Sequence, residues 1–219
     1  MESSLLTDEQ KTILKCVFEE PRLGDFYLSG GTALAAFHLR HRVSDDLDFF
    51  SYTEVDGQFV QNFTEALRRK IAARSVAYDR LYDRRLFTFI LTADQILKIE
   101  FTHYPFLQLE QPETHDGIRV DGKRDLAANK LMTMLDRFDP KDFVDLYFLL
   151  EERPLADMVK DAETKFLKTI DPVFLGGELL KARRIVGLPR MIKPLSVKTV
   201  TDFFTEQARS LKKDIFSEG

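Results

Sequence analysis

The chain has 219 residues, 44% hydrophobic and 31% charged, the composition of a globular protein with room for one large domain or two modest ones. Its net charge of −4 argues against a protein that coats nucleic acid without selectivity, although it leaves a local basic groove open. The single cysteine excludes an intrachain disulfide, no apolar run nears the ~20 residues that cross a bilayer, and no secretory leader is recognised, so we predict a cytoplasmic protein with no membrane partner.

Helices and strands are predicted to alternate in the first half of the chain. The capping box Thr7-Asp8-Glu9-Gln10 predicts a helix that begins there and ends before Pro21. Apolar periodicity then predicts, in chain order, a strand at 26–28, a helix at 32–38, a strand at 43–50, an amphipathic helix at 57–73, and strands at 86–91, 96–102 and 118–120.

From Asp125 onward the pattern changes to successive helices, predicted at 126–138, 142–151, 155–167 and 197–216. The fold class is therefore α+β, with helices dominating the second half. We place the boundary near Gly122, so that residues 1–122 form a core domain and residues 123–219 form a helical C-terminal domain.

Two aspartates share one face of the strand predicted at 43–50. Asp46 and Asp48 are two residues apart, so in extended backbone both side chains point to the same side of the sheet. Carboxylates held ~6–7 Å apart along a strand repel each other unless a cation lies between them. Mg²⁺ prefers oxygen ligands and keeps sites for water and phosphate, so the pair predicts a magnesium site.

A third carboxylate is expected on a neighbouring strand. Apolar and polar residues alternate over 97–102, and Glu100 is the one carboxylate on the polar face. Two interpretations follow: Glu100 joins Asp46 and Asp48 at the metal, or it faces solvent on an edge strand and pairs with Lys98. The alternation favours neither.

A glycine pair precedes the acidic pair, at the junction between a predicted strand and a predicted helix. Glycines let backbone N–H groups approach a phosphate closely, so Gly30 and Gly31 are candidates for nucleotide contact. Fourteen residues separate Gly31 from Asp46, enough for one helix and a return loop that would bring the two motifs together. Arg42 and Ser44 are further candidates, although Arg42 is as well placed to cap the junction between loop and strand.

Two longer stretches carry a recognisable pattern. The first is Phe26-Tyr27-Leu28-Ser29-Gly30-Gly31-Thr32-Ala33-Leu34-Ala35, followed by Arg42-Val43-Ser44-Asp45-Asp46-Leu47-Asp48-Phe49-Phe50. The second is Asp125-Leu126-Ala127-Ala128-Asn129-Lys130-Leu131, then Arg137, then Lys141-Asp142-Phe143-Val144-Asp145-Leu146-Tyr147. Together, over residues 26–150, they resemble the AbiEii/AbiGii nucleotidyltransferases, abortive-infection toxins of the polymerase-beta-like superfamily.

The resemblance implies a nucleotidyltransferase core with a small mixed sheet flanked by helices, and a helical domain that closes over the nucleotide. It implies that Asp46 and Asp48 bind the metal, Mg²⁺ or alternatively Mn²⁺, and that Glu100 takes the third-carboxylate position, where the family commonly has the shorter Asp. The residues that it implies for contact with the NTP are Ser29, Gly30, Gly31, Thr32, Lys130 and Asp142.

The helical motif has two physical interpretations. Lys130 and Arg137 are seven residues apart, hence on one side of a helix, and two such cations suit a triphosphate. Alternatively, they form an interhelical ion-pair network with Asp142 and Asp145. The resemblance favours nucleotide contact for Lys130, leaves Asp142 open between the two, and assigns Asp145 a structural role.

The predicted activity is metal-dependent transfer of a nucleoside monophosphate from an NTP to a macromolecular acceptor, with release of pyrophosphate. The resemblance implies that the acceptor is RNA, such as the 3′ end of a tRNA, and that a cognate antitoxin protein opposes the toxin. The alternatives are nucleotidylation of a protein and a catalytically idle binding module of the same fold. Two basic clusters, at 68–74 and 181–184, are candidates for an acceptor groove, with solvated helix faces as the other interpretation.

Overall fold

The computed structural model describes residues 5–54 and 56–217, which form two compact units. The sheet unit comprises residues 5–38, 44–54, 56–106 and 111–122. The helical unit comprises residues 39–43, 107–110 and 123–217. It therefore includes two short segments that precede the main run of helices along the chain.

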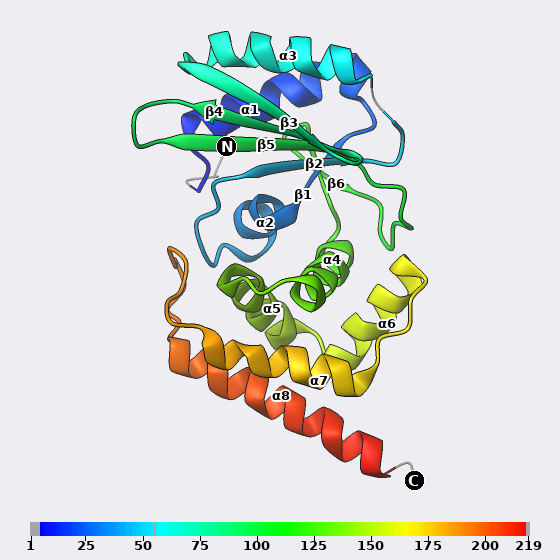
Figure 1. The fold of residues 1–219 in the computed structure, drawn as a ribbon. Coiled ribbons are helices and arrows are strands. Elements are labelled where there is room, and N and C mark those ends of the chain that lie inside the picture. The colour runs from blue at the N-terminus through cyan, green and yellow to red at the C-terminus, as the bar shows by residue number, and fades with distance from the viewer. Residues whose placement is uncertain (1–4, 55, 218–219) are drawn as a thin grey trace. The chain divides into compact units, whose positions relative to one another are not determined.

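Within the described residues, the sheet unit is built on seven strands in the order β3-β4-β5-β2-β1-β7-β6 (Figure 1). β2 runs parallel to β5 and β1 runs parallel to β7, whereas the other neighbours are antiparallel. The strands are β1 Tyr27–Ser29, β2 Leu47–Ser51, β3 Ser75–Leu81, β4 Arg84–Ile90, β5 Ile96–His103, β6 Glu113–His115 and β7 Ile118–Val120. The sheet is thus mixed, and the predicted α+β class is confirmed.

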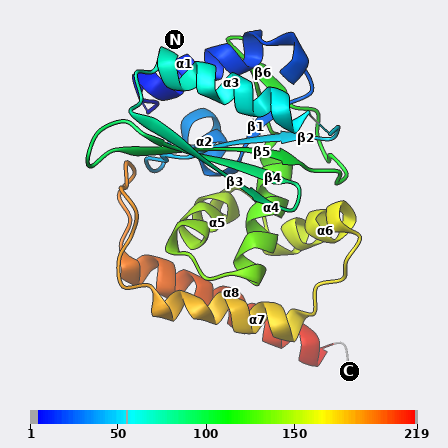
Figure 2. The ribbon, with the colours of Figure 1, turned by 45° about the horizontal axis from the view of Figure 1, so that its top comes forward.

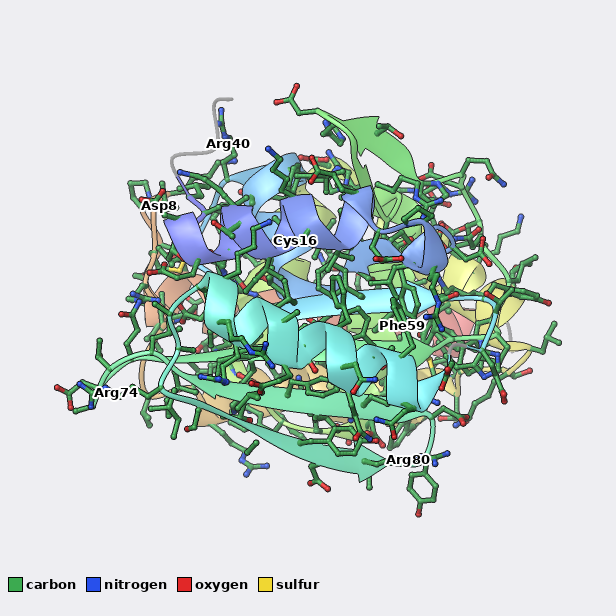
Figure 3. All side chains as sticks on the ribbon, turned by 90° about the horizontal axis from the view of Figure 1, so that it is seen from above. Asp8, Cys16, Arg40, Phe59, Arg74 and Arg80 are labelled. Atoms are coloured by element: carbon green, nitrogen blue, oxygen red, sulfur yellow. The ribbon has the colours of Figure 1, made fainter. Side chains whose placement is uncertain are left out.

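Helices cover the two faces of this sheet unequally. α1 (Asp8–Glu19) and α3 (Gly57–Lys70) lie side by side on one face, as Figure 3 shows, with Cys16 marking α1 and Phe59 marking α3. α2 (Gly30–Ala33), which continues as a π-helical turn over Leu34–Leu39, lies on the opposite face (Figure 1). Helix α1 begins as predicted, because Thr7 and Gln10 form both hydrogen bonds of the capping box.

Aromatic rings fill the face of the sheet under α1 and α3. Phe49 of β2 stacks on Phe101 of β5 with ring centroids 5.1 Å apart, and Phe18 of α1 meets Phe49 edge-on at 6.0 Å. Because side chains alternate between the two faces, this packing turns the polar residues of β2 and β5 toward the other face. The alternation predicted for the segment 97–102 is therefore present in β5.

The helical unit consists mainly of helices that follow one another along the chain. They are α4 Lys123–Asp136, α5 Pro140–Glu152, α6 Leu155–Phe166, α7 Pro172–Leu180, a 3₁₀ turn at Lys181–Arg184 and α8 Val197–Ser217. α7 and α8 lie side by side (Figure 1, Figure 2), and Phe143 of α5 meets Phe204 of α8 at 5.2 Å. No helix in the described ranges is long and apolar enough to span a bilayer.

Sequence analysis does not predict β3, β6 or α7. Six of the seven residues of β3 are exposed, so the strand has no buried face for an apolar alternation to mark. Helix α7 contains Gly176 and Gly177, residues that disfavour a helix interior, yet both lie where no neighbouring atom crowds them. Tertiary packing against α8 therefore outweighs local propensity in α7.

Candidate active site

Strand register brings three polar side chains into one row across β1, β2 and β5. Ser29 lies opposite Asp48, and Asp48 lies opposite Glu100. Residues opposite each other on neighbouring strands point to the same face, and the strands are about 4.8 Å apart. The structure thus brings Asp48 and Glu100 together, on the face that α1 and α3 do not cover.

Sequence analysis places Asp46 within a strand at 43–50, and this is wrong. In the structure Asp46 lies in a loop directly before β2, which begins at Leu47. The buried hydroxyl of Thr32 donates a hydrogen bond to the Asp46 carbonyl, and the Gln10 amide donates to the carbonyls of Ser44 at 3.1 Å and Asp45 at 3.0 Å. Side chains, not a neighbouring strand, therefore bind the backbone of this acidic loop (residues 44–46), which is why the strand begins only at 47.

Gly30 brings the backbone unusually close to Asp48. A Cβ atom at position 30 would lie 2.0 Å from Asp48 Oδ2, and the backbone of Gly30 has φ +68°, a left-handed conformation. Both observations exclude a larger residue without movement of the carboxylate. The helix accordingly begins at Gly30, two residues earlier than predicted, with Gly31 in its first turn.

The hydroxyl groups on either side of the glycines have protein partners. Ser29 is buried and donates to Asp121 Oδ2 at 2.7 Å, while Thr32 binds the acidic loop. In this structure both hydroxyls support the backbone around the glycines. Their predicted contact with phosphate stays a prediction.

Glu100 forms a two-pronged ion pair with Arg84 at the start of β4. Arg84 Nε lies 2.7 Å from Oε1 and Nη2 lies 2.6 Å from Oε2, while the Thr102 hydroxyl donates to Oε1 at 2.5 Å. The hydrogen bond to Glu100, together with the charge of Asp48, raises the pKa of Arg84. Glu100 is 9% exposed on a central strand, so the alternative of a solvent-facing edge residue paired with Lys98 is wrong.

Asp48 offers oxygen donors beside Gly30, Asp46 precedes it by two residues, and both residues are half-buried. This donor chemistry fits Mg²⁺ or Mn²⁺. Among residues 5–54 and 56–217, however, no three His, Cys, Asp or Glu side chains are gathered as a metal-binding group. Glu100 is held by Arg84, so it would complete a set of three carboxylates only by exchanging that partner.

In the helical unit, Asp145 is the centre of a buried ion-pair network. Arg42 binds it with Nε at 2.6 Å and Nη2 at 2.8 Å, His41 Nε2 lies 2.7 Å from Oδ1, and Lys130 Nζ lies 2.8 Å from Oδ2. Burial alone would raise the pKa of Asp145, but Lys130, Arg42 and His41 together hold it far below the usual range. Lys130 also lies 2.9 Å from Asp142.

The predicted nucleotide-contact residues of the helical motif therefore differ in their surroundings. Arg42 is 2% exposed, and Nη1 donates to the Val43 carbonyl at 3.0 Å, which matches the alternative of a backbone cap. Lys130 takes part in the ion-pair network that was the alternative interpretation. Arg137 approaches Asp142 only at 3.5 Å and its side chain is 60% exposed, so it keeps free surface for a ligand. For Arg42, Ser44, Lys130, Arg137 and Asp142, nucleotide contact stays a prediction.

Sequence analysis missed three residues that hold this site. Arg84 is 16 residues from Glu100, Asp121 is 92 from Ser29, and Gln10 is 34 from Ser44. Each pairing depends on strand order or on the packing of α1, and no local pattern marks it. The one available signal is the capping box, which places Gln10 in the first turn of α1.

Comparison with known proteins gives concordant matches. The family profile described as "Nucleotidyl transferase AbiEii toxin, Type IV TA system" matches residues 12–213. An uncharacterized protein of Aquifex aeolicus (strain VF5), aq_aa25, is 34% identical over 165 residues, which cover 74% of this chain and 76% of the relative.

Two solved structures share the fold. A putative nucleotidyltransferase from H. pylori has a TM-score of 0.60 at 18% identity and covers 98% of this chain and 99% of its own. MenT4, a nucleotidyltransferase toxin from Mycobacterium tuberculosis H37Rv, has a TM-score of 0.53 at 16% identity, over 85% of this chain and 75% of its own.

Proposed function

This chain belongs to the AbiEii family of nucleotidyltransferases, and from that premise we propose that Asp46 and Asp48 form its catalytic centre. The enzyme transfers a nucleotidyl group. We propose which residues carry out the transfer and which molecule accepts the group. The main support is the close contact between Gly30 and Asp48: because Gly30 has no side chain, its backbone can lie against the Asp48 carboxylate.

Asp46 and Asp48 would hold Mg²⁺, with Mn²⁺ as the alternative ion. When bound there, such an ion would neutralise charge on the triphosphate and on the pyrophosphate leaving group. The absence of a Cβ at Gly30 lets the Asp48 carboxylate lie directly against the glycine backbone, whose N–H groups are the proposed contacts for phosphate. Thr32 and Gln10 keep Asp46 in position by binding the carbonyl groups of the acidic loop.

Glu100 is the proposed third carboxylate. In the structure Arg84 aligns it beside Asp48 through two hydrogen bonds, so Arg84 is a positioning residue in this proposal. When Arg84 is released, Glu100 can accept the proton of the acceptor hydroxyl that attacks the α-phosphate. Its additional methylene, relative to the Asp that is common in the family, gives it the reach to exchange partners.

We propose that the catalytic core corresponds to residues 1–122 and that the helical domain, residues 123–219, supplies Arg137 to the triphosphate. The Arg137 side chain is 60% exposed, against 12% for Lys130, and Asp142 lies 3.5 Å from it. Lys130 sets the spacing of α4 and α5 through its pairs with Asp142 and Asp145. The proposed NTP donor is compatible with the cytoplasmic location that we propose for the enzyme.

RNA, such as the 3′ end of a tRNA, is the acceptor that we propose, with a cognate antitoxin as protein partner. The support is the family description, which specifies a toxin of a type IV toxin–antitoxin system, and the fold shared with the toxin MenT4. Protein nucleotidylation remains the second candidate, because the chain carries a net charge of −4.

The test is a transfer assay in which each labelled NTP is incubated with RNA and protein extracts. Asp46→Asn and Asp48→Asn are expected to lose about 100-fold or more of the transfer. Asp45→Asn is the matched control, because it removes the same charge from the exposed neighbour of Asp46. Unchanged transfer in Asp46→Asn or Asp48→Asn, with circular dichroism showing a folded protein, would refute the assignment.

The same assay separates the alternatives. Label in the protein fraction would replace RNA by a protein acceptor. An idle binding module predicts no transfer to either fraction and no Mg²⁺-dependent NTP binding by calorimetry. Growth arrest on induced expression, dependent on Asp48, would support the toxin role.

A further inference from the structure

The two basic clusters found in the sequence differ in how the protein uses their charge. In the first cluster, at the end of α3, Arg68 and Arg69 are compensated by a carboxylate of their own helix. Glu65 lies 2.8 Å from Arg68 and 3.5 Å from Arg69, and the hydrogen bond to Glu65 raises the pKa of Arg68. This cluster has the properties of a solvated helix face.

The second cluster extends much further than the sequence motif indicates. Residues 181–198, which we call the basic segment, contain no Asp or Glu and six basic residues: Lys181, Arg183, Arg184, Arg190, Lys193 and Lys198. The two terminal lysines pair with Glu178 and Asp202, which lie outside the segment. The four basic side chains between them are all exposed. Across the described part of the chain, no ion pair involves Arg183, Arg184 or Lys193.

The basic segment is held in a defined conformation. It leaves α7 and returns to α8 at their shared end (Figure 1). The backbone of Val43 donates to the Arg190 carbonyl at 2.8 Å, and Ile192 and Lys193 both donate to the His41 carbonyl, at 2.8 and 3.0 Å. Since Arg42 and His41 are anchored in the Asp145 network, these bonds attach the loop to a rigid, buried part of the helical unit.

Aromatic rings position two of its cations. The Arg184 guanidinium lies 4.6 Å above the ring centre of Phe138, and Lys193 Nζ lies 5.4 Å from that of Phe148. Such contacts restrict the side chain while its charged end stays in solvent. Phe138 follows Arg137 directly, so Arg184 lies beside the α4–α5 turn that bears this exposed cation.

We propose that the basic segment binds the backbone of single-stranded RNA; this inference rests on the proposed RNA acceptor. Arg183, Arg184 and Lys193 are exposed and make no ion pair with a described residue, which suits phosphate binding, and arginine binds phosphate with two hydrogen bonds. A guanidinium held above an aromatic ring can also stack with an unpaired base.

The composition of the surface favours RNA over an acidic protein. A protein interface has an apolar centre from which charged residues are depleted. The exposed apolar residues here, Val186 (98%) and Ile192 (44%), lie separately among the cations and form no such centre.

The experiment measures binding of a fluorescent single-stranded RNA oligonucleotide by anisotropy, without NTP. The test variant is Arg183→Gln/Arg184→Gln/Lys193→Gln. The control, Arg69→Gln/Lys70→Gln/Arg74→Gln, removes the same charge from the first cluster. We expect the test variant to bind about tenfold or more weakly at 0.1 M salt and the control to stay within about twofold. The slope of log K against log salt should fall by about 2, from about 0.7 per lost phosphate contact.

Equal weakening by the two triple variants would show that only net charge matters and would overturn the proposal. Poly-glutamate that competes as well as RNA, and loses binding in the same variant, would instead assign the surface to an acidic protein. Asp48→Asn is expected to bind RNA normally, which separates this inference from the catalytic proposal. RNA binding through the segment, with no transfer of label to RNA, would leave this inference intact and refute the proposed acceptor.

Discussion

The sheet unit and the helical unit each place carboxylates on neighbouring elements, but they neutralise them differently. Asp145 of the helical unit is fully buried and takes hydrogen bonds or ion pairs from Arg42, His41 and Lys130. In the sheet unit, Asp46 makes no ion pair with any residue that the structure describes, and it is half-buried. The removal of a buried carboxylate leaves its buried cationic partners uncompensated, so the fold depends on it, whereas a half-buried carboxylate without such partners suits a diffusible cation.

Glu100 lies between these two extremes. It belongs to the row of side chains around Asp48, yet Arg84 neutralises it as fully as Arg42 neutralises Asp145. The comparison therefore teaches that proximity to Asp48 is not sufficient to identify a metal ligand. The partner that a carboxylate already has decides how readily it can bind an ion.

The largest effect is expected from Asp145→Asn, which removes the charge at the centre of the buried ion-pair network. The substitution leaves Arg42 buried without its counter-charge and Lys130 with Asp142 alone, so the free energy of unfolding should fall by about 3–5 kcal/mol. Urea denaturation followed by circular dichroism measures it. Asp142→Asn is the control and should cost only about 1–3 kcal/mol, because Lys130 keeps Asp145. Equal losses in the two variants would contradict the central place of Asp145.

Gly30→Ala tests the sheet unit in the same way. The new methyl group meets Asp48 Oδ2 and the left-handed backbone is strained, so transfer should fall about 100-fold and stability by about 1–2 kcal/mol. Gly176→Ala is the matched control, since no atom lies within 4 Å of its added Cβ inside α7. It should gain about 0.5–1 kcal/mol of stability and keep full activity. Normal activity of Gly30→Ala would show that the close approach to Asp48 is not functional.

Arg84→Met tests whether Glu100 can bind an ion once its ion pair with Arg84 is removed. Without Arg84 the carboxylate adds its charge to that of Asp48, and Mn²⁺ affinity, measured by electron paramagnetic resonance of free Mn²⁺, should rise about tenfold. Arg85→Met changes the next residue, which points to the other face of β4, and should leave the affinity as it was. A weaker affinity in Arg84→Met would mean that Arg84 helps to build the ion site.

The smallest effect concerns pH. Burial lowers the pKa of His41 below 6.5, despite the opposing effect of Asp145, and His41 Nδ1 has no hydrogen-bond partner among the described atoms. The unfolded chain therefore binds a proton at His41 more readily than the folded chain. The contribution of neutral His41 to the free energy of unfolding is fully present above pH 6.5 and is lost as the pH falls below it. Denaturation midpoints between pH 7.5 and 5.5 measure this, and His41→Asn should flatten the profile. A midpoint that rises on acidification would contradict a neutral His41.

Local patterns in the sequence predict the elements with strong signals. The capping box at Thr7 and the apolar alternation around Glu100 both correspond to observed elements, and the fold class is confirmed. The exposed edge strand β3 carries no such signal.

The surroundings of the site depend on strand order and on tertiary contacts. Residue spacing predicts neither of them: Arg84 binds Glu100 from the adjacent strand, and the acidic loop takes its donors from α1 and α2. The carboxylates themselves could be proposed from sequence, but not the side chains that align them.

The Gln10 amide, which donates to two carbonyl groups of the acidic loop, has a practical consequence for handling the protein. It sits in the first turn of α1, where helices fray most easily. An affinity tag fused directly before Thr7, or a deletion that removes the first turn, would loosen Asp46 without touching any carboxylate. An inactive preparation of such a protein would then reflect the position of the tag and not the chemistry of the enzyme.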